Sequence, residues 1–373
     1  MPPLMIDVRA AEDLRDVVHR AVQAVSEGKL VVFPTETIYG VAARAMDADA
    51  VARMAEVKGR RSGNPFALAI KSFEEARDYV PDMSPLAQRL ARRCWPGPVT
   101  LVVDDCHPES LVRQLPELVQ RAVSPEQKIG LRVPGHAIVL DVLRMVAGPL
   151  ALTSANRSGQ TDARTAEEAV ESLGDDVDLV LDDGPTRFGQ PSSVVYVRED
   201  GFEILRPGVV PERTLKRLTS LMLLFVCTGN TCRSPMAESL CRKELSERLH
   251  CSMDDLEDRG IVVVSAGIAA MAGGRATAEA VEVMNKCGVD LRFHEAQPLT
   301  EPLVRHADVV FAMTQSHREA IVSQWPGAAE RTRLLCQSGG DLADPIGGPL
   351  ERYQRCGEQI RREVKARLDE LNL

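Results

Sequence analysis

A short polar loop stands between an apolar run, residues 221–226, and a strong helix-forming segment, residues 236–249. Ser234 is predicted to cap this helix and Pro235 to be its first residue, since serine and proline are favoured at these positions. The loop then directs successive backbone N–H groups, and the positive end of the helix dipole, at one small volume. This feature constrains the chain to a strand–loop–helix unit with an anion-binding site at its centre.

The loop carries residues suited to chemistry on a bound anion. Cys227 stands at its start and Arg233 at its end, six positions later. A cysteine facing a helix N-terminus is favoured as a thiolate nucleophile, and an arginine can bind two oxygens of a tetrahedral oxyanion. Glycine and asparagine inside the loop suit a tight turn, and a serine hydroxyl can donate a hydrogen bond to the thiolate. The rest of the predicted phosphate loop comprises Thr228, Gly229, Asn230, Thr231, Cys232 and Ser234.

A cysteine nucleophile also needs an acid that protonates the leaving group. Asp344 supplies a carboxylate in an Asp-Pro turn, and the Ile-Gly-Gly that follows keeps this segment out of regular structure. We therefore predict that Cys227, Arg233 and Asp344 are catalytic. The predicted reaction passes through a phosphocysteine on Cys227, with Asp344 acting first as acid and then as base.

With these residues in place, residues 222–373 resemble the low-molecular-weight protein phosphatases. The resemblance also rests on motifs downstream of the loop, which are Ser265-Ala266-Gly267, Ala307-Asp308-Val309, Ala312-Met313-Thr314 and Asp344-Pro345. Within that family the chain is most similar to the bacterial protein-arginine phosphatases. Thr231 replaces a bulkier aliphatic residue and can recognise a planar guanidinium, and no aromatic residue directly follows the Asp-Pro turn. The resemblance implies a phosphoprotein substrate, with phosphoarginine favoured.

Alternatives stay open for this half. It could act on phosphotyrosine, or as an arsenate reductase, which uses the same loop but requires further redox cysteines within reach. Cys287, Cys336 and Cys356 are present, yet they are not closely paired in the sequence. Cys232 could form a protective disulfide with Cys227 or could be a packing residue at the helix start.

Length and composition describe a two-domain globular protein. The 373 residues suffice for two full cores, and a net charge of −9 argues against a basic nucleic-acid module. The apolar run at 221–227 is too short to span a bilayer, and the N-terminus lacks a signal-peptide pattern. Nine cysteines without a framework spacing suit a reducing compartment, and no spacing predicts a zinc site. We expect a cytoplasmic protein with no membrane contact, no resident metal and at most weak direct RNA binding.

Short apolar strands alternate with amphipathic helices along the whole chain, which is the pattern of α/β architecture. The elements predicted in the first half include helices over residues 10–27 and 49–58 and strands over 30–33 and 66–70. A turn-rich, charged segment, 206–220, precedes the apolar run. We therefore predict two domains, 1–215 and 221–373, with the boundary near residues 215–220.

The first half contains neither G-x-x-x-x-G-K-[ST] nor G-x-G-x-x-G, the two common phosphate loops. Instead, small polar and basic clusters follow predicted strands or helices, where α/β proteins bind ligands. These clusters are residues 34–40, 58–61, 132–134, 153–156 and 206–208. Cations there suit phosphate, and hydroxyls and amides suit a small polar substrate.

Together with Asn64-Pro65 and the segment 95–100, these clusters make residues 8–210 resemble the threonylcarbamoyl-adenylate synthase family. The resemblance implies a YrdC-like α/β domain with a twisted open sheet, and the phosphatase resemblance implies a doubly wound parallel sheet for the second domain. The implied reaction converts L-threonine, bicarbonate and ATP to threonylcarbamoyl-AMP and pyrophosphate, with Mg²⁺ accompanying ATP. Partner proteins then use the product for the t6A modification of adenosine 37 in tRNA.

The same resemblance assigns residues of the clusters to substrates. The implied ATP-binding residues are Lys58, Arg60, Ser62, Asn156, Arg164 and Arg206, and the implied threonine-binding residues are Thr35, Arg132, Ser154 and Ser192. The chain departs from the family in having Arg61 where proline commonly follows Lys-x-Arg, and we expect that loop to be less rigid as a result. An alternative of another class makes one half a non-catalytic binding or regulatory module. The intact key residues of both halves favour two enzymes.

Overall fold

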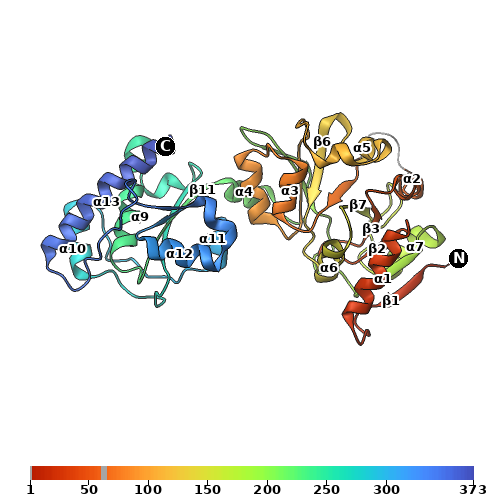
Figure 1. Cartoon of the computed structure of the whole chain (residues 1–373), viewed down its shortest axis with the longest axis horizontal. Helices are drawn as coiled ribbons and strands as arrows, with labels where there is room; N and C mark the ends of the chain where they lie inside the picture. Colours follow the sequence, from red (N-terminus) through yellow and green to blue (C-terminus); the bar gives the residue numbers. More distant parts are fainter. Residues whose placement is uncertain (1, 60–64) are drawn as a thin grey trace. The chain divides into compact units, whose positions relative to one another are not determined.

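The computed structural model describes residues 2–59 and 65–373, so two predicted ATP-binding residues, Arg60 and Ser62, lie outside the described residues. The chain divides into two compact units, Met1–Leu218 and Thr219–Leu373, each with its own core (Figure 1). This division lies within the segment that separates the two predicted domains. Among the described residues, no helix combines the length and the apolar character that crossing a membrane requires.

The first unit is built on a mixed sheet whose ten strands follow the order β1-β8-β2-β3-β7-β4-β6-β5-β9-β10. The strands are β1 (Leu4–Asp7), β2 (Val31–Phe33), β3 (Gly40–Arg44), β4 (Ala67–Ala69), β5 (Val99–Asp104), β6 (Lys128–Arg132), β7 (Leu150–Ser154), β8 (Leu179–Asp182), β9 (Ser193–Val197) and β10 (Phe202–Arg206). The pairs β1–β8, β2–β8, β4–β6 and β5–β9 are parallel, and the other neighbours are antiparallel. The predicted α/β class is therefore confirmed, with an open mixed sheet in this unit.

Helices cover both faces of this sheet (Figure 1). They are α1 (Leu14–Ser26), α2 (Ala48–Val57), α3 (Phe73–Tyr79), α4 (Pro85–Cys94), α5 (Glu117–Val123), α6 (Ala137–Met145), α7 (Ala166–Leu173) and α8 (Glu212–Thr219). Because side chains of a strand alternate between faces, Val31 and Phe33 join the core under α1 and α6, whereas Val32 joins the larger core under α2, α4 and α5.

The element ends differ from the sequence prediction by a few residues. The first helix begins at Leu14 rather than at residue 10, because the Asp13 side chain accepts a hydrogen bond from the backbone N–H of Arg15 and caps the helix. Asp47 caps α2 in the same way. The predicted strand over 66–70 is reduced to β4, Ala67–Ala69. In each case the type of element is right and local capping or pairing sets its end.

The second unit has a parallel sheet in the order β12-β11-β13-β14. Its elements are β11 (Leu221–Cys227), α9 (Arg233–Arg248), β12 (Ile261–Gly267), α10 (Ala278–Lys286), α11 (Glu301–His306), β13 (Val309–Ala312), α12 (Gln315–Gln324), β14 (Thr332–Leu334) and α13 (Leu350–Glu370). Phe225 packs in the core with α9, α10 and α13, and Val226 packs in the core with α11 and α12. This is the predicted doubly wound arrangement, with helices on both faces of the sheet.

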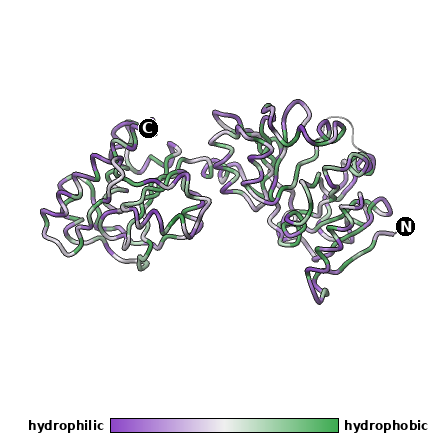
Figure 2. The backbone as a smooth tube through the Cα atoms, in the orientation of Figure 1, coloured by the Kyte–Doolittle hydropathy of each residue, from purple (hydrophilic) through white to green (hydrophobic). Residues whose placement is uncertain are grey.

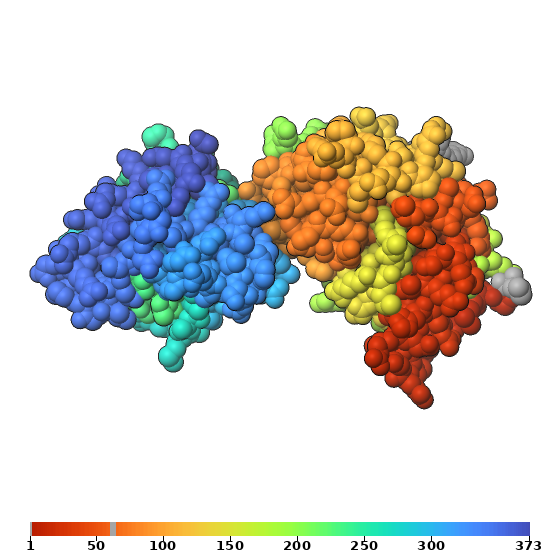
Figure 3. All heavy atoms as spheres, viewed as in Figure 1, coloured from red at the N-terminus to blue at the C-terminus, as the bar shows by residue number. Residues whose placement is uncertain are grey.

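The hydropathy of the chain follows this layering. The tube is mostly green along the strands inside each unit and mostly purple along the helices and loops at the outside (Figure 2). On the face of the second unit seen in Figure 3, the blue surface comes from the second half of that unit's chain, which includes α12 and α13. In each unit the interior strands are therefore enclosed, whereas the edge strands β1 and β10 of the first unit are largely exposed.

Candidate active sites

Cys227 is the last residue of β11, an interior strand of the parallel sheet, so the phosphate loop begins at the strand's carboxyl end. The side chain is buried, with 3% exposure. Its Sγ lies 2.9 Å from Ser234 Oγ and accepts a hydrogen bond from the backbone N–H of Asn230 at 3.2 Å. Asn230 has φ 54, in the left-handed region that asparagine tolerates, which lets the loop fold back over the sulfur.

The helix after the loop begins earlier than the sequence predicts. α9 starts at Arg233 with Cys232 at the N-cap position and no side-chain cap, so the assignment of Ser234 as cap and Pro235 as first residue is wrong. The hydroxyl of Ser234 instead lies against the sulfur and accepts a hydrogen bond from Asn230 Nδ2 at 2.9 Å. Because N–H groups point outward from a helix N-terminus, here into the phosphate loop, a ligand rather than a capping side chain can satisfy them.

Asn230 is the centre of a buried frame behind the loop. Its Nδ2 also donates to Ser265 Oγ at 2.8 Å, and its Oδ1 accepts from the backbone N–H of Gln297 at 2.9 Å. His294 Nε2 lies 2.8 Å from its carbonyl oxygen. The sequence analysis assigned Asn230 to the phosphate loop and its tight turn but missed these supports, of which Ser265 alone was signalled by a quoted motif. Their separation in sequence hides the frame until the chain folds.

Ser265 also donates a hydrogen bond to Glu238 Oε2, at 2.6 Å. Burial raises the pKa of Glu238, while the bond from Ser265 and the nearby His294 act in the opposite direction. The frame is thus a continuous hydrogen-bonded chain from α9 to the nucleophile loop.

Arg233 and Asp344, far apart in sequence, form an ion pair between Nη2 and Oδ2. The Arg233 side chain is 5% exposed and that of Asp344 is 38% exposed. Arg233 also donates to the carbonyl of Leu342 at 3.2 Å and to Thr228 Oγ1 at 3.4 Å. The structure therefore brings the three predicted catalytic residues to one loop. An oxyanion in this loop would compete with the carboxylate for the guanidinium and release Asp344, which could then take up a proton and act as an acid.

All nine cysteines are free thiols. Cys232 is buried at the helix start, where its Sγ lies 3.5 Å from Thr277 Oγ1 and 3.6 Å from the Tyr353 hydroxyl. Burial raises the pKa of Cys336, and it raises that of Cys356 to about 12. Thiols held protonated in this way are poor nucleophiles, which disfavours the arsenate-reductase alternative.

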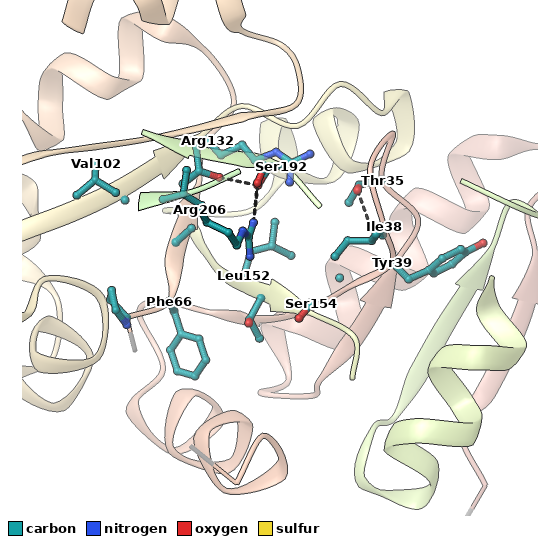
Figure 4. A pocket seen from close by; sticks show the side chains of 17 residues that line it. Thr35, Ile38, Tyr39, Phe66, Val102, Arg132, Leu152, Ser154, Ser192 and Arg206 are labelled. Atoms are coloured by element: carbon teal, nitrogen blue, oxygen red, sulfur yellow. Dashed lines mark hydrogen bonds between the residues drawn. The ribbon is translucent and has the colours of Figure 1, made fainter. Parts of the chain in front are cut away.

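A cavity of about 140 Å³ lies in the first unit (Figure 4). Its lining combines apolar side chains with hydroxyls and two arginines. The predicted residues Thr35, Arg132, Ser154, Ser192 and Arg206 all line it, together with Ile38, Phe66, Val102 and Leu152. A small cavity of this composition suits a polar molecule that also carries an apolar group.

Arg206 and Ser192 form one wall of the cavity. Arg206 Nη2 donates to the carbonyl and to the hydroxyl of Ser192, at 2.8 and 3.1 Å, and the hydroxyl lies 3.0 Å from Thr100 Oγ1 (Figure 4). Burial lowers the pKa of Arg206, against the opposing effect of Asp162. The wall thus presents a guanidinium and two linked, buried hydroxyls.

Arg132 is held by a partner that the sequence analysis did not single out. Its Nη2 donates to Glu36 Oε1 at 2.8 Å and to Thr37 Oγ1 at 3.0 Å, with both charged side chains less than a tenth exposed. Thr35 Oγ1 donates to the carbonyl of Ile38 at 2.6 Å. A substrate carboxylate at Arg132 would therefore share the guanidinium with Glu36, whose only sequence signal was its place in the cluster at 34–40.

Lys58, Ser154 and Asn156 form one cluster, although about 100 residues separate the lysine from the others. Lys58 Nζ donates to the Ser154 carbonyl at 2.7 Å and to Asn156 Oδ1 at 3.0 Å. Ser154 Oγ donates to Asn156 Oδ1 at 2.5 Å. Lys58 and Asn156 do not line the cavity, but Ser154 does, so the cluster adjoins it. The cluster arises because α2 ends beside the end of β7.

Comparison with known proteins assigns each unit to a protein family. Residues 23–208 match the family model of the Sua5, YciO and YrdC proteins, described as "Telomere recombination", and residues 222–373 match "Low molecular weight phosphotyrosine protein phosphatase". The Threonylcarbamoyl-AMP synthase of Mus musculus is 34% identical over 222 residues, 58% of this chain and 75% of that protein. The Protein-arginine-phosphatase of Bacillus subtilis is 39% identical over 142 residues, 37% of this chain and 88% of that protein. The chain belongs to both families.

The match to some synthases is partial in length. The Threonylcarbamoyl-AMP synthase of Pyrococcus abyssi is 36% identical over 195 residues, 52% of this chain, and the chain spans about half of that relative, 54%. The predicted resemblance to a fusion of the two families is nevertheless confirmed. Among the described residues of the synthase unit, the predicted ones line the cavity or adjoin it through the Lys58 cluster, except that Arg164 is exposed and is not among its lining residues. In the phosphatase unit Thr231 lies half-buried beside Cys232 in the loop.

Proposed function

We propose that the synthase unit makes threonylcarbamoyl-AMP from L-threonine, bicarbonate and ATP. The observation that carries this proposal is the cavity that joins Thr35, Ser192 and Arg206 to the adjoining Lys58 cluster. Bicarbonate first condenses with the threonine amine to a carbamate. A carbamate oxygen then forms a bond to the α-phosphorus as the bond to the bridging β-oxygen breaks, and the electron pair leaves with pyrophosphate. The product would be used by proteins that modify tRNA.

The residues of the site divide this work between them. The hydroxyls of Ser192 and Thr100 bind and orient threonine and the carbamate, and the Arg206 guanidinium, which is bonded to Ser192, binds the nucleotide beside them. Lys58, which already donates to several oxygens, transfers these hydrogen bonds in part to phosphate oxygens as charge moves onto pyrophosphate. The apolar side chains around them exclude water from the carbamate.

Mg²⁺ is proposed to accompany ATP. Among the described residues no group of three or more His, Cys, Asp or Glu side chains could hold a metal ion. Glu36, the carboxylate at the Thr35 loop, is paired with Arg132. These residues fit an ion held mainly by phosphate oxygens and water, where it would neutralise part of the triphosphate charge.

Exchange of labelled pyrophosphate into ATP tests this proposal. The purified chain should catalyse exchange only when L-threonine and bicarbonate are both present. Serine and valine in place of threonine should support much slower exchange. Absence of threonine-dependent exchange would favour the alternative in which this unit is a non-catalytic binding or regulatory module.

We propose that the second unit is a protein-arginine phosphatase. Support comes from Thr231 in the loop and from Ile346, 60% exposed beside the acid, where an aliphatic side chain suits the methylenes of arginine. Cys227 Sγ forms a bond to phosphorus as the phosphorus–nitrogen bond of phosphoarginine breaks, and Asp344 gives its proton to the leaving nitrogen. Asp344 then takes a proton from water, whose oxygen attacks phosphorus and releases the thiolate.

Phosphate release from phosphoarginine and phosphotyrosine proteins, measured side by side, tests this second activity. Cys227→Ser serves as the blank, because serine keeps the oxyanion site but is a much weaker nucleophile. Phosphoarginine should be hydrolysed faster. Preference for phosphotyrosine would keep the mechanism and overturn the specificity.

A further inference from the structure

A buried histidine outside the predicted site contacts the phosphate loop. His317 lies in the first turn of α12 and is 7% exposed. Its Nε2 is 2.9 Å from Thr228 Oγ1, the first loop residue after the nucleophile, and its Nδ1 is 2.8 Å from Thr314 Oγ1. The ring thus bridges two hydroxyls that are 86 residues apart in sequence.

The surroundings of the ring favour its neutral form. Burial lowers the pKa of His317, and the nearby Arg233 lowers it further, while Asp344 and Asp341 act in the opposite direction. A neutral imidazole has one N–H donor and one acceptor nitrogen, so its two hydroxyl neighbours have different roles. We infer the tautomer that carries its hydrogen on Nε2. In this tautomer Nε2 donates to the Thr228 hydroxyl oxygen, and the Thr314 hydroxyl donates to Nδ1.

Thr228 connects the histidine to the catalytic arginine. Its Oγ1 accepts a hydrogen bond from Arg233 Nη2 at 3.4 Å and has a second lone pair for the N–H of His317. The Thr228 residue itself is exposed, so without the buried ring its side chain could rotate freely. With the ring in place, Oγ1 faces Arg233 and is a fixed acceptor beside the guanidinium.

We propose that His317 is a positioning residue for Arg233, acting through the hydroxyl of Thr228. This inference rests on the proposed phosphatase function. While Asp344 is bound to Arg233, the guanidinium has two other acceptors, Thr228 Oγ1 and the carbonyl of Leu342. When an oxyanion displaces Asp344, those two acceptors hold the guanidinium in the plane that bidentate binding requires.

Capping of α12 does not explain the whole contact. Thr314 Oγ1 already caps the helix by accepting the backbone N–H of His317 at 3.3 Å. The Nδ1 side of the ring adds to that local arrangement. The Nε2 side reaches a different element, and this is the contact that a role in helix capping or packing would not need.

Two substitutions of His317 separate these roles in the full chain. The amide of His317→Gln places an N–H donor near the position of Nε2, whereas His317→Asn reaches only the position of Nδ1. We expect His317→Asn to lower kcat for para-nitrophenyl phosphate about tenfold and to weaken inorganic phosphate binding, since one oriented hydrogen bond is lost. His317→Gln should stay within about threefold of the unsubstituted chain.

Thr228→Val and a remote histidine complete the experiment. Thr228→Val should lower kcat as much as His317→Asn, and the double variant should be no slower than either single variant, because both remove one connection. His250→Asn, an exposed histidine with φ 50 in the same unit, is the matched control and should retain full turnover.

Equal losses in His317→Asn and His317→Gln would show a packing role and overturn the proposal. Unchanged turnover in both His317 variants would also overturn the proposal. Additive losses when His317→Asn is combined with Thr228→Val would overturn it as well. If the unsubstituted chain turns over no phosphate ester, the proposed function fails instead. The dissociation constants for inorganic phosphate, measured by calorimetry, then decide the role of His317. We expect His317→Asn to bind phosphate more weakly and His317→Gln to keep the affinity of the unsubstituted chain.

Discussion

Ser234 Oγ lies 2.9 Å from Cys227 Sγ, inside the first turn of α9 rather than at its cap. The hydroxyl also accepts from the Asn230 amide, and of the two acceptors near its own hydrogen the sulfur, at 2.9 Å, is closer than the Ala266 carbonyl, at 3.4 Å. A buried thiolate needs such donors, because removing it from water without them is costly. The same hydroxyl can stabilise the thiolate that leaves when the phosphocysteine is hydrolysed.

Ser234→Ala should lower kcat for phosphate release about tenfold, since a hydrogen bond to a charged group is lost from the transition state. Steady-state kinetics with para-nitrophenyl phosphate measure this. Ser239→Ala is the matched control on the same helix, because its hydroxyl bonds to the helix carbonyls of Pro235 and Met236 and to the Met284 sulfur, away from Cys227. Equal effects of the two changes would contradict the assignment.

Asp344→Asn should lower turnover in proportion to the basicity of the leaving group. With a basic leaving nitrogen or alkoxide we expect a loss of about 10²–10³-fold, because general acid catalysis supplies rate enhancements of this size. With para-nitrophenyl phosphate, whose leaving group needs little protonation, the loss should be much smaller. A series of aryl phosphates measures the dependence, and a uniform loss across the series would argue for a role in binding alone.

Thr231→Ile should shift preference from phosphoarginine toward phosphotyrosine. The substitution removes a hydroxyl that can bond to the guanidinium and adds apolar surface that suits a phenol ring. The kcat/KM for phosphoarginine divided by that for phosphotyrosine should fall by about tenfold or more. This is the change expected when a hydrogen bond is lost and an apolar contact is gained. An unchanged ratio would remove the main support for the phosphoarginine assignment.

Lys58→Met should abolish threonine-dependent pyrophosphate exchange and leave phosphatase turnover unchanged. Methionine keeps the length and burial of the side chain but removes the Lys58 hydrogen bond to the carbonyl of Ser154 and one of the two hydrogen bonds to Asn156 Oδ1. The cost to the first unit is about 1–3 kcal/mol of unfolding free energy. Phosphatase activity of the same sample is the internal control for an intact chain. Exchange near the original rate would exclude Lys58 from the site.

The stability of the second unit should fall on acidification partly through His317. Burial holds the pKa of this histidine below its ordinary 6.5. As the pH falls below 6.5 the unfolded chain binds a proton that the folded chain does not, so the free energy of unfolding decreases; above 6.5 the contribution is complete. In a Trp95→Phe background, urea unfolding followed by Trp325 fluorescence reports on this unit. His317→Gln should reduce the slope between pH 7 and 5, and an identical slope would refute the prediction.

Local sequence was sufficient for the elements around the phosphate loop. An apolar run, a glycine-containing loop and a helix-forming segment predict strand, loop and helix from neighbouring residues alone, and Cys227 and Arg233 are both inside that window. Prediction failed at the helix start. Capping preferences describe a helix that satisfies its own N–H groups, whereas in α9 the first turn is open toward a ligand site.

What the sequence by itself determined, then, is the local chemistry: which side chains stand on loops at strand ends, and the division of the chain into two cores. Tertiary structure decided which of these residues meet. The pairing of Arg233 with Asp344, of Arg132 with Glu36 and of His317 with Thr228 joins segments far apart in the chain. Periodicity and propensity act over a few residues, but such contacts depend on strand order and helix packing, which only the folded chain establishes.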